Sequence, residues 1–167
     1  PVDDSECPFN IPASWCWCRL GDTTNYSYAH KIDPKSIDAD TWVLELEDVE
    51  KITSRLLKRV TNRERQTRSA KCVFQASDVI YGKLRPYLDK VIVADQDGFC
   101  TTEMIPIKGY YGIQPEFLRW ILKSPYFIDY ANQSTHGMNL PRLGTDKARL
   151  SLIPLPPAAE QQRIVAK

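Results

Sequence analysis

The segment from residue 78 to residue 107, DVIYGKLRPYLDKVIVADQDGFCTTEMIPI, constrains the fold more than any other part of the chain. It contains three strand-like runs that are separated by turn signals, at residues 79–81, 91–94 and 99–107. This spacing predicts a β-meander. The first turn carries Lys83 and Arg85, and Pro86 stiffens its backbone. The meander is therefore expected to hold two cations rigidly at a surface.

The size and composition of the chain favour one folded domain. Its 167 residues, 43% of them apolar, are enough to enclose a hydrophobic core. No run approaches the length of a membrane span, and the acidic N-terminus lacks the apolar stretch of a signal peptide. Five cysteines at irregular spacing fit a reduced, cytoplasmic protein better than a disulfide framework. We expect an α+β fold, in which helices pack on a twisted, mostly antiparallel β-sheet and a C-terminal helix protrudes.

The net charge of +1 hides a strong asymmetry along the chain. Residues 1–50 carry 3 basic and 11 acidic side chains, whereas residues 51–90 carry 11 basic and 3 acidic ones. One interpretation is a basic face that lies beside an acidic face. The other is that the two solvated segments pair with each other. The charge pattern alone does not choose between them.

Aromatic residues mark the first part of the chain. Trp15 and Trp17 share one parity in the first predicted strand, where we expect both to pack in the core. A polar loop is predicted at residues 22–36. Its Tyr26 and Tyr28 are interpreted as packing residues, with stacking on nucleic-acid bases as the alternative.

A basic run follows a short strand predicted at residues 41–46. Its members are Lys51, Arg55, Lys58, Arg59, Arg63, Arg65, Arg68 and Lys71. Apolar residues at helical spacing in residues 46–60 permit one amphipathic helix, but a strand, a helical turn and a second strand are equally permitted. Residues 61–70 have almost no apolar content, so they are predicted to form a solvent-facing loop.

The C-terminal third is predicted to be mainly helical, with helices at residues 115–123, 125–132 and 158–167. Ser124 is the expected N-cap of the second of these helices. Between the helices we expect an ordered loop, a short turn and a last strand, at residues 133–144, 146–149 and 150–155. The loop is expected to present Asn139 and Arg142 at its tip, and Thr145 to cap the turn. The final helix has an incomplete apolar seam, which predicts that it needs a partner or a continuation.

Sites for chemistry are weakly supported by the sequence. The spacing of Cys16 and Cys18 is shorter than zinc ligand pairs prefer, and neither histidine has a nearby second ligand, so no metal and no cofactor are expected. Cys72 or Cys100 as a nucleophile would be a third class of function, but neither has a base that the sequence reveals. Glycine-rich phosphate loops and methyltransferase or nuclease motifs are absent from the sequence. The chain is therefore expected not to be an enzyme.

Five segments in order resemble the target recognition domain of type I restriction–modification specificity subunits. They are IPASWCWCRLGD, DVIYGKLRPYLDKV with GFCTTE, GIQPEFLRWILKS, GMNLPRLG and LIPLPPAAEQQRIVAK. The resemblance implies a recognition domain at residues 1–155 and the beginning of a spacer helix at residues 156–167. It implies that such a domain reads one half of a bipartite DNA site. It further implies as partners an adenine-N6 methyltransferase subunit, a motor-nuclease restriction subunit, and a second recognition domain or a homodimer partner.

Arginine, lysine and amide side chains are the groups expected to contact double-stranded DNA, because they bind phosphates and base edges. The predicted DNA-binding residues are Arg63, Arg65, Arg68, Lys71, Lys83, Arg85, Asn139 and Arg142. Gln133 is an alternative to Asn139 as a reader of adenine. The competing hypothesis is a protein-interaction module that uses the C-terminal helix and the acidic N-terminal third, without DNA binding of its own.

Overall fold

The computed structural model describes residues 2–27 and 30–167, and it has an α+β fold, as predicted. The α-helices are α1 (Leu20–Thr23), α2 (Asn62–Arg65), α3 (Pro115–Leu122), α4 (Pro125–Gln133), α5 (Thr145–Leu150) and α6 (Ala158–Val165). The short 3-10 helices are η1 (Asp4–Glu6), η2 (Pro34–Ser36), η3 (Leu46–Asp48) and η4 (Pro86–Leu88).

The strands divide among several small sheets, where one sheet was expected. The strands are β1 (Cys16–Arg19), β2 (Lys31–Ile32), β3 (Val43–Leu44), β4 (Lys71–Phe74), β5 (Val79–Gly82), β6 (Val91–Val93), β7 (Gly98–Thr101), β8 (Met104–Ile107), β9 (Thr135–His136), β10 (Arg142–Leu143) and β11 (Leu152–Leu155). The sheet orders are β6-β5-β8, β2-β4-β7-β3, β1-β11 and β10-β9. All pairs in them are antiparallel except β3 with β7.

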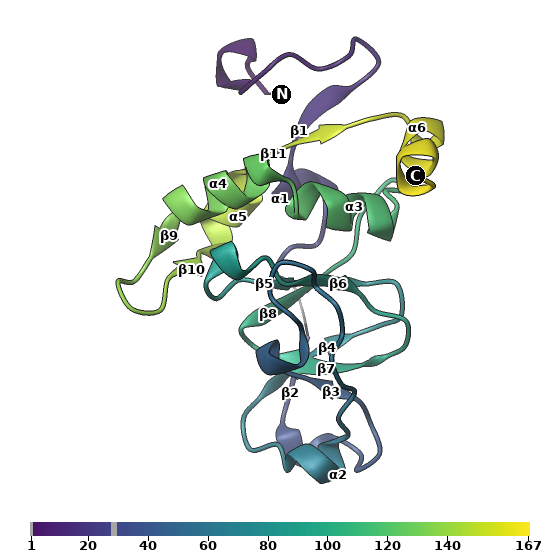
Figure 1. Ribbon diagram of the computed structural model, residues 1–167, viewed down its shortest axis with the longest axis vertical. Coiled ribbons are helices and arrows are strands. Elements are labelled where there is room, and N and C mark those ends of the chain that lie inside the picture. Colours follow the sequence, from purple (N-terminus) through teal and green to yellow (C-terminus); the bar gives the residue numbers. More distant parts are fainter. Residues whose placement is uncertain (1, 28–29) are drawn as a thin grey trace.

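The sheet β6-β5-β8 lies in the middle of three layers. In β5, Val79 and Tyr81 belong to a core cluster that includes residues of α3 and α4, while Ile80 belongs to a second cluster with Phe74 and Cys100 of the next sheet. Successive side chains of a strand point to opposite faces, so this strand is covered on both sides. Figure 1 shows the result: helices α3, α4 and α5 lie on one side of this sheet, and the sheet of β2, β3, β4 and β7 lies on the other.

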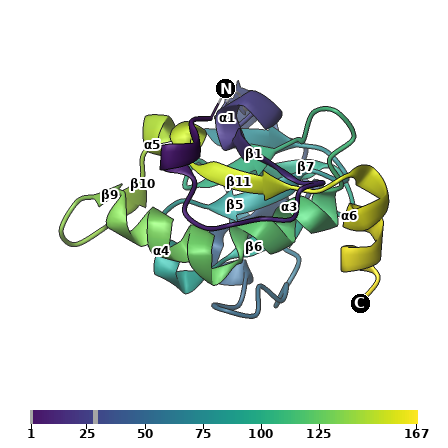
Figure 2. The ribbon, with the colours of Figure 1, turned by 90° about the horizontal axis from the view of Figure 1, so that it is seen from above.

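The far end of the molecule is a distal lobe, which we define as residues 31–74 together with β7. Its strands β2, β3, β4 and β7 enclose Trp42, Leu44 and Phe74, and α2 lies at its tip (Figure 1). At the opposite end, the ribbon β1-β11 joins the N-terminal segment to α6, as Figure 2 shows from above. Figures 1 and 2 both show the hairpin of β9 and β10 projecting sideways from the helices.

The predicted meander is wrong in its last strand. The run at residues 99–107 is divided by a turn at Thr102 and Glu103 into β7 and β8, which enter different sheets. Strand β8 returns beside β5, whereas β7 pairs with β4 and β3. The polar residues at positions 101–103 mark this turn in the sequence, but the prediction placed them inside one strand.

Three other segments differ from the sequence predictions. Residues 61–70 contain α2, which starts with a capping box formed by Thr61 and Glu64, and the run is not wholly a loop. Residues 46–60 form η3 and isolated bridges, so the single amphipathic helix is wrong. The predicted loop at residues 133–144 forms the β9–β10 hairpin.

The helical prediction for the C-terminal third is confirmed. Helices α3 and α4 match the predicted ranges to within one residue, and Ser124 caps α4 by accepting a hydrogen bond from the Phe127 amide at 3.2 Å. The last strand begins two residues later than predicted, because α5 extends to Leu150. Gly144 rather than Thr145 is the N-cap of α5. Across residues 2–27 and 30–167, no helix is both long enough and apolar enough to cross a membrane.

The aromatic residues near the N-terminus do not all pack in the core. Tyr26 is 1% exposed and belongs to the main core, whereas Tyr28 lies outside the described residues. Trp15 and Trp17 are half-buried at the margin of the fold. The Trp15 indole donates to Glu160 of α6 at 3.0 Å, and the Trp17 ring packs edge-on against Tyr126 of α4. Core packing of the two tryptophans is therefore corrected to a role in attaching the ribbon and α6.

The seam of α6 already has a partner within the chain. Ile164 and Val165 pack against the main core, and the buried Gln161 amide accepts from the Gln114 backbone at 3.1 Å. The C-terminal helix is present as predicted, and it lies against α3.

Because β5 is covered on both faces, truncation there should destabilise the whole molecule. We predict that Ile80→Ala lowers the free energy of unfolding by about 2–5 kcal/mol, since Ile80 is fully buried. The matched control is Leu57→Ala, which removes the same number of carbon atoms from a side chain that is 51% exposed and should change stability by less than about 0.5 kcal/mol. Urea denaturation measures both; equal losses would contradict the layered core.

Candidate nucleic-acid interface

The eight predicted DNA-binding residues fall into two groups in the structure. One group lies on α2 and β4 and on the turn between them, in the distal lobe: Arg63, Arg65, Arg68 and Lys71. The other group lies around the β9–β10 hairpin and the turn after β5: Lys83, Arg85, Asn139 and Arg142. The sequence separates the two halves of this second group by more than fifty residues, and backbone pairing brings them together.

Arg65 is committed to a buried ion pair. Its guanidinium donates to the carboxylate of Asp48, whose side chain is fully buried, and to Glu47 at 3.0 Å. Burial disfavours the charge on Arg65, but the hydrogen bond to Asp48 and the nearby carboxylates keep its pKa above the ordinary value. Asp48 also accepts from the Glu45 backbone amide at 2.8 Å, which closes the start of η3. Arg65 therefore joins α2 to the segment 45–48.

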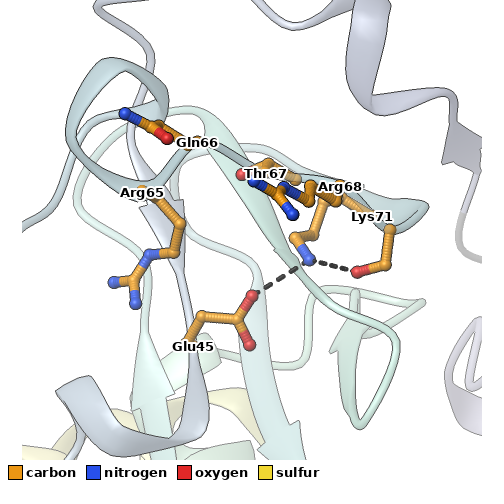
Figure 3. Close-up of a pocket in the computed structure, with 7 residues that line it drawn as sticks. Glu45, Arg65, Gln66, Thr67, Arg68 and Lys71 are labelled. Atoms are coloured by element: carbon orange, nitrogen blue, oxygen red, sulfur yellow. Dashed lines mark hydrogen bonds and ion pairs between the residues drawn. The ribbon is translucent and has the colours of Figure 1, made fainter.

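Lys71 is held in a similar way. Its side chain is 4% exposed, and its ammonium group lies 3.0 Å from Glu45 and donates to Ser69 at 2.8 Å. Figure 3 shows these contacts across a depression of about 510 Å³ that is lined by Glu45 and residues 65–69 and 71. A buried ammonium with two partners is poorly placed to reach a phosphate.

Most of the basic run pairs with the acidic segment before it. Arg55 pairs with Glu50, Lys58 with Glu47 and Asp48, and Arg63 with Asp40. Arg59 instead donates from one nitrogen, Nη2, to both carboxylate oxygens of Asp95 at 2.8 Å, and its guanidinium stacks over Trp42 at 4.1 Å. Most of the basic run therefore agrees with the second interpretation of the charge asymmetry, in which the acidic and basic segments pair with each other.

Arg68 differs from these residues. It is exposed on the turn that follows α2, and none of the residues that the structure describes gives it an ion-pair partner. The turn begins at Gln66, whose backbone is left-handed (φ 50°) and whose amide donates to the Asn62 carbonyl at 2.8 Å. The distal lobe therefore presents Arg68 outward, at the rim of the depression in Figure 3.

The second group is assembled by backbone hydrogen bonds. The Arg85 amide donates to the Pro141 carbonyl at 2.7 Å, and the Leu143 amide donates to the Lys83 carbonyl at 3.0 Å. The Lys83 amide in turn donates to the Glu103 carbonyl at 3.0 Å. The turn after β5 thus runs beside β10, and it places Lys83 and Arg85 at the base of the hairpin.

Arg142 anchors the hairpin to the turn between β7 and β8. Its guanidinium makes a two-pronged contact with Glu103, with nitrogen–oxygen distances of 2.8–3.1 Å, and it donates to the Leu140 carbonyl at 3.1 Å. The hydrogen bonds from Arg142 lower the pKa of Glu103. Arg142 was predicted at the tip of the loop but lies in β10, with its charge matched by a carboxylate.

The tip of the hairpin is residues 137–141, GMNLP. Asn139 is exposed there, as predicted, and so is Met138, whose side chain is fully exposed, while Leu140 is 45% exposed. Sequence reasoning missed Met138 and Leu140; their signal was a pair of apolar residues in a glycine- and proline-rich segment that lacks strand periodicity. Gln133 is exposed at the end of α4, outside this tip.

Outside these two groups, the free thiols of Cys16 and Cys18 lie 3.4 Å apart on β1. All five cysteines are free thiols, and Cys72 and Cys100 lie opposite each other on β4 and β7 in the core, 2% and 0% exposed. A substrate could reach neither thiol without unfolding the distal lobe. Within the described ranges, no three histidine, cysteine or acidic side chains come together as metal ligands would.

The buried pair of Arg65 and Asp48 gives a sharp stability prediction. Arg65→Ala removes the guanidinium from the buried Asp48 carboxylate and leaves it with the Lys58 ammonium at 3.5 Å as its remaining cation, so it should cost up to about 3–5 kcal/mol of unfolding free energy. Arg63→Ala on the same short helix breaks an exposed pair with Asp40 and should cost less than about 1 kcal/mol. Thermal melts and urea titrations compare the two variants; a similar small loss in both would show that the buried pair does not hold the lobe together.

The contact of Arg142 with Glu103 should appear in the pH dependence of stability. A carboxyl group whose pKa is lowered on folding contributes stability above its unfolded pKa, near 4.5, and loses it as the pH falls through the folded value. The stability difference between the wild type and Glu103→Gln should therefore be constant above about pH 5 and shrink at lower pH. Glu116→Gln, at a position on α3 away from the hairpin, is the matched control. A difference that does not change between about pH 6 and pH 3 would refute this assignment.

The sequence of this chain is similar to those of two known proteins. The chain is 32% identical over 159 residues to the type I restriction enzyme EcoDI specificity subunit of Escherichia coli, and 25% identical over 185 residues to the EcoAI specificity subunit of the same organism. These matches cover 95% and 100% of this chain but 35% and 30% of the relatives, so the chain spans about a third of their length. No family model matches the sequence.

Solved structures agree in fold. The HsdS subunit from Thermoanaerobacter tengcongensis superposes with a TM-score of 0.78 at 25% identity, over 97% of this chain and 43% of that one. A chain from a structural account of complex assembly in the type I R-M system gives 0.78 at 26% identity, over 95% of this chain and 42% of that one. The S subunit from M. genitalium shares the fold alone, with a TM-score of 0.61 at 12% identity over 96% of this chain and 40% of that one. The resemblance of the five segments is thus confirmed: this chain is related, in sequence and in fold, to the specificity subunits of type I restriction enzymes.

Proposed function

We propose that this chain binds double-stranded DNA sequence-specifically and reads one half of a bipartite site as part of a type I specificity subunit. The observation that carries the proposal is the rigid hairpin region, where Lys83 and Arg85 lie beside an anchored β-ribbon and no described carboxylate pairs with either side chain. Unpaired cations held on a fixed backbone suit phosphate contacts, because binding then releases counterions without breaking internal ion pairs.

The eight predicted residues receive different roles in this proposal according to whether a carboxylate already pairs with them, and not according to the group in which they lie. Arg68, Lys83, Arg85 and Asn139 are the residues that we assign to DNA contact. Arg65, Lys71 and Arg142 are assigned to shaping the surface, since each already has a carboxylate partner at 3.0 Å or closer. Arg63 is intermediate, because its pair with Asp40 is exposed and can exchange for a phosphate.

The wider assembly follows from the relatives as part of the same proposal. Residues 1–155 act as the recognition domain, and residues 156–167 begin a spacer helix. The chain does no chemistry itself and acts in the cytoplasm with an adenine-N6 methyltransferase subunit and a motor-nuclease restriction subunit. The second half-site is read by another recognition domain or by a homodimer partner. Support comes from the kinship with specificity subunits and from the inaccessibility of the cysteines in the core.

The protein-interaction alternative has less support in the structure than it had from the sequence alone. Its two surfaces were the seam of α6 and the acidic segment, and each makes its main contacts inside the chain. Retardation of duplex DNA by the chain at low salt distinguishes the two proposals.

Salt dependence of binding tests which cations touch phosphates. We predict that Arg85→Ala and Arg68→Ala each weaken binding to all duplexes alike. Each should also reduce the slope of log affinity against log salt by about 0.9 for every phosphate that the variant no longer neutralises. Fluorescence anisotropy between about 50 and 200 mM salt measures these slopes.

Arg65→Ala is the informative comparison for this measurement. In conditions where it remains folded, its salt slope should equal that of the wild type, because the Arg65 charge is turned toward Asp48 and Glu47. Unchanged affinity and slope in both Arg68→Ala and Arg85→Ala would remove these residues from the interface.

A further inference from the structure

The tip of the β9–β10 hairpin combines features that the proposed function leaves unexplained. Met138 is fully exposed and Leu140 is 45% exposed, although both are apolar and neither belongs to a core cluster. They flank Asn139, at the end of the ribbon that projects from the molecule in Figures 1 and 2. Single exposed apolar residues are ordinary on proteins, but two on one rigid projection form a surface that can bind something.

The tip is held in place without help from these two side chains. The ribbon is fixed by the Arg142–Glu103 contact and by the bonds from Arg85 and Leu143 to the neighbouring backbone. Gly137 has a left-handed backbone (φ 92°), and a Cβ there would lie 3.1 Å from the Leu140 carbonyl, so the turn is tightly closed. Met138 and Leu140 are therefore presented outward on a preformed support.

The charges around the tip favour a polyanionic partner. From residue 130 to residue 145 the sequence contains no acidic residue, and the nearby Glu103 is matched by Arg142. Lys83 and Arg85 lie at the base of the same ribbon. A protein partner could use the apolar tip, but a ribbon whose own residues carry no carboxylate and that has cations at its base fits the phosphates that border a DNA groove.

The width of the β9–β10 ribbon indicates which groove of DNA it can enter. Two strands lie about 4.8 Å apart, and their side chains add to that width, so a ribbon fits the major groove of about 12 Å and not the minor groove of about 6 Å. In the major groove the apolar group on a base edge is the C5 methyl of thymine. We propose that Met138 and Leu140 contact thymine methyl groups in the major groove and so determine specificity at one or two positions of the half-site. This inference rests on the proposed function and goes beyond it by naming the residues and the chemical group they read.

Replacing thymine by uracil in the DNA removes the methyl group alone and gives a direct test. The 167-residue chain first selects its preferred duplex from a random pool at low salt, and anisotropy then compares that duplex with versions that carry uracil at each thymine in turn. The wild type should bind about fourfold more weakly for each contacted methyl group that is removed, the equivalent of about 0.8 kcal/mol. Met138→Ser and Leu140→Ser should each abolish this sensitivity at the thymine that the replaced side chain contacts, and both variants should keep the wild-type salt slope.

Two further variants make the comparison specific. Met138→Leu keeps an apolar side chain and should retain the sensitivity to uracil, whereas Trp120→Ala removes an exposed apolar group from α3 and should behave as the wild type does. Identical selected sequences and identical uracil effects in the wild type and both serine variants would overturn the inference while leaving DNA binding intact. Failure of the wild type to bind any duplex at low salt would instead overturn the proposed function, and the inference with it.

Discussion

The fold depends on burying one short strand, β5, from both sides. Val79 and Tyr81 face the helices and Ile80 faces the distal lobe, so the strand belongs to two cores at once. Such a strand cannot alternate between apolar and polar residues, and VIYG does not. The two cores therefore share one sheet, and the distal lobe cannot move against the helices without exposing apolar surface to water. The turn after β5, which carries Lys83 and Arg85, inherits this rigidity because it continues directly from the strand.

Most cations of the basic run form ion pairs within the chain and so contribute to the fold. The distal lobe has a small apolar core, and its segments 40–50 and 55–71 are joined by ion pairs, of which Arg65 with Asp48 is the most buried. Burying such a pair costs desolvation energy for both groups, so its contribution lies mainly in fixing how the segments fit together. The cations that remain for a partner are few. They lie on turns whose backbones are tied down, which limits the entropy that is lost on binding.

Local signals predicted the elements that local physics determines. Proline at the first position of α3 and α4, the cap at Ser124 and the helical spacing of apolar residues placed both helices to within one residue. The capping box of Thr61 and Glu64 was visible in the sequence as well, but the polar composition of residues 61–70 outweighed it.

Strand pairing was harder to predict. The polar residues at positions 101–103 indicate a turn within the run 99–107, but no local signal shows that its two halves enter different sheets, since both halves contribute to a core. For the candidate site, the sequence likewise predicted which residues take part but not which of them form ion pairs. Arg142 and Glu103 are 39 positions apart, and only the fold brings the Glu103 carboxylate to the hairpin. Which cations are free is a property of the whole fold, so it could not be read from the order of the charges.

The β9–β10 hairpin has one set of residues that holds it in place and another set at its exposed end. The residues that hold the hairpin, Arg142 and Glu103, are constrained by geometry that several backbone bonds share. The residues at its end, Met138 to Leu140, contribute almost nothing to the core. Substitutions at the end can thus alter what the ribbon contacts at little cost in folding free energy, whereas substitutions at the anchor change stability and the placement of the tip together. Under the proposed function, a scaffold of this kind would change the DNA sequence it reads and keep the same fold, provided that the double-sided burial of β5 and the charge pairs of the distal lobe are left intact.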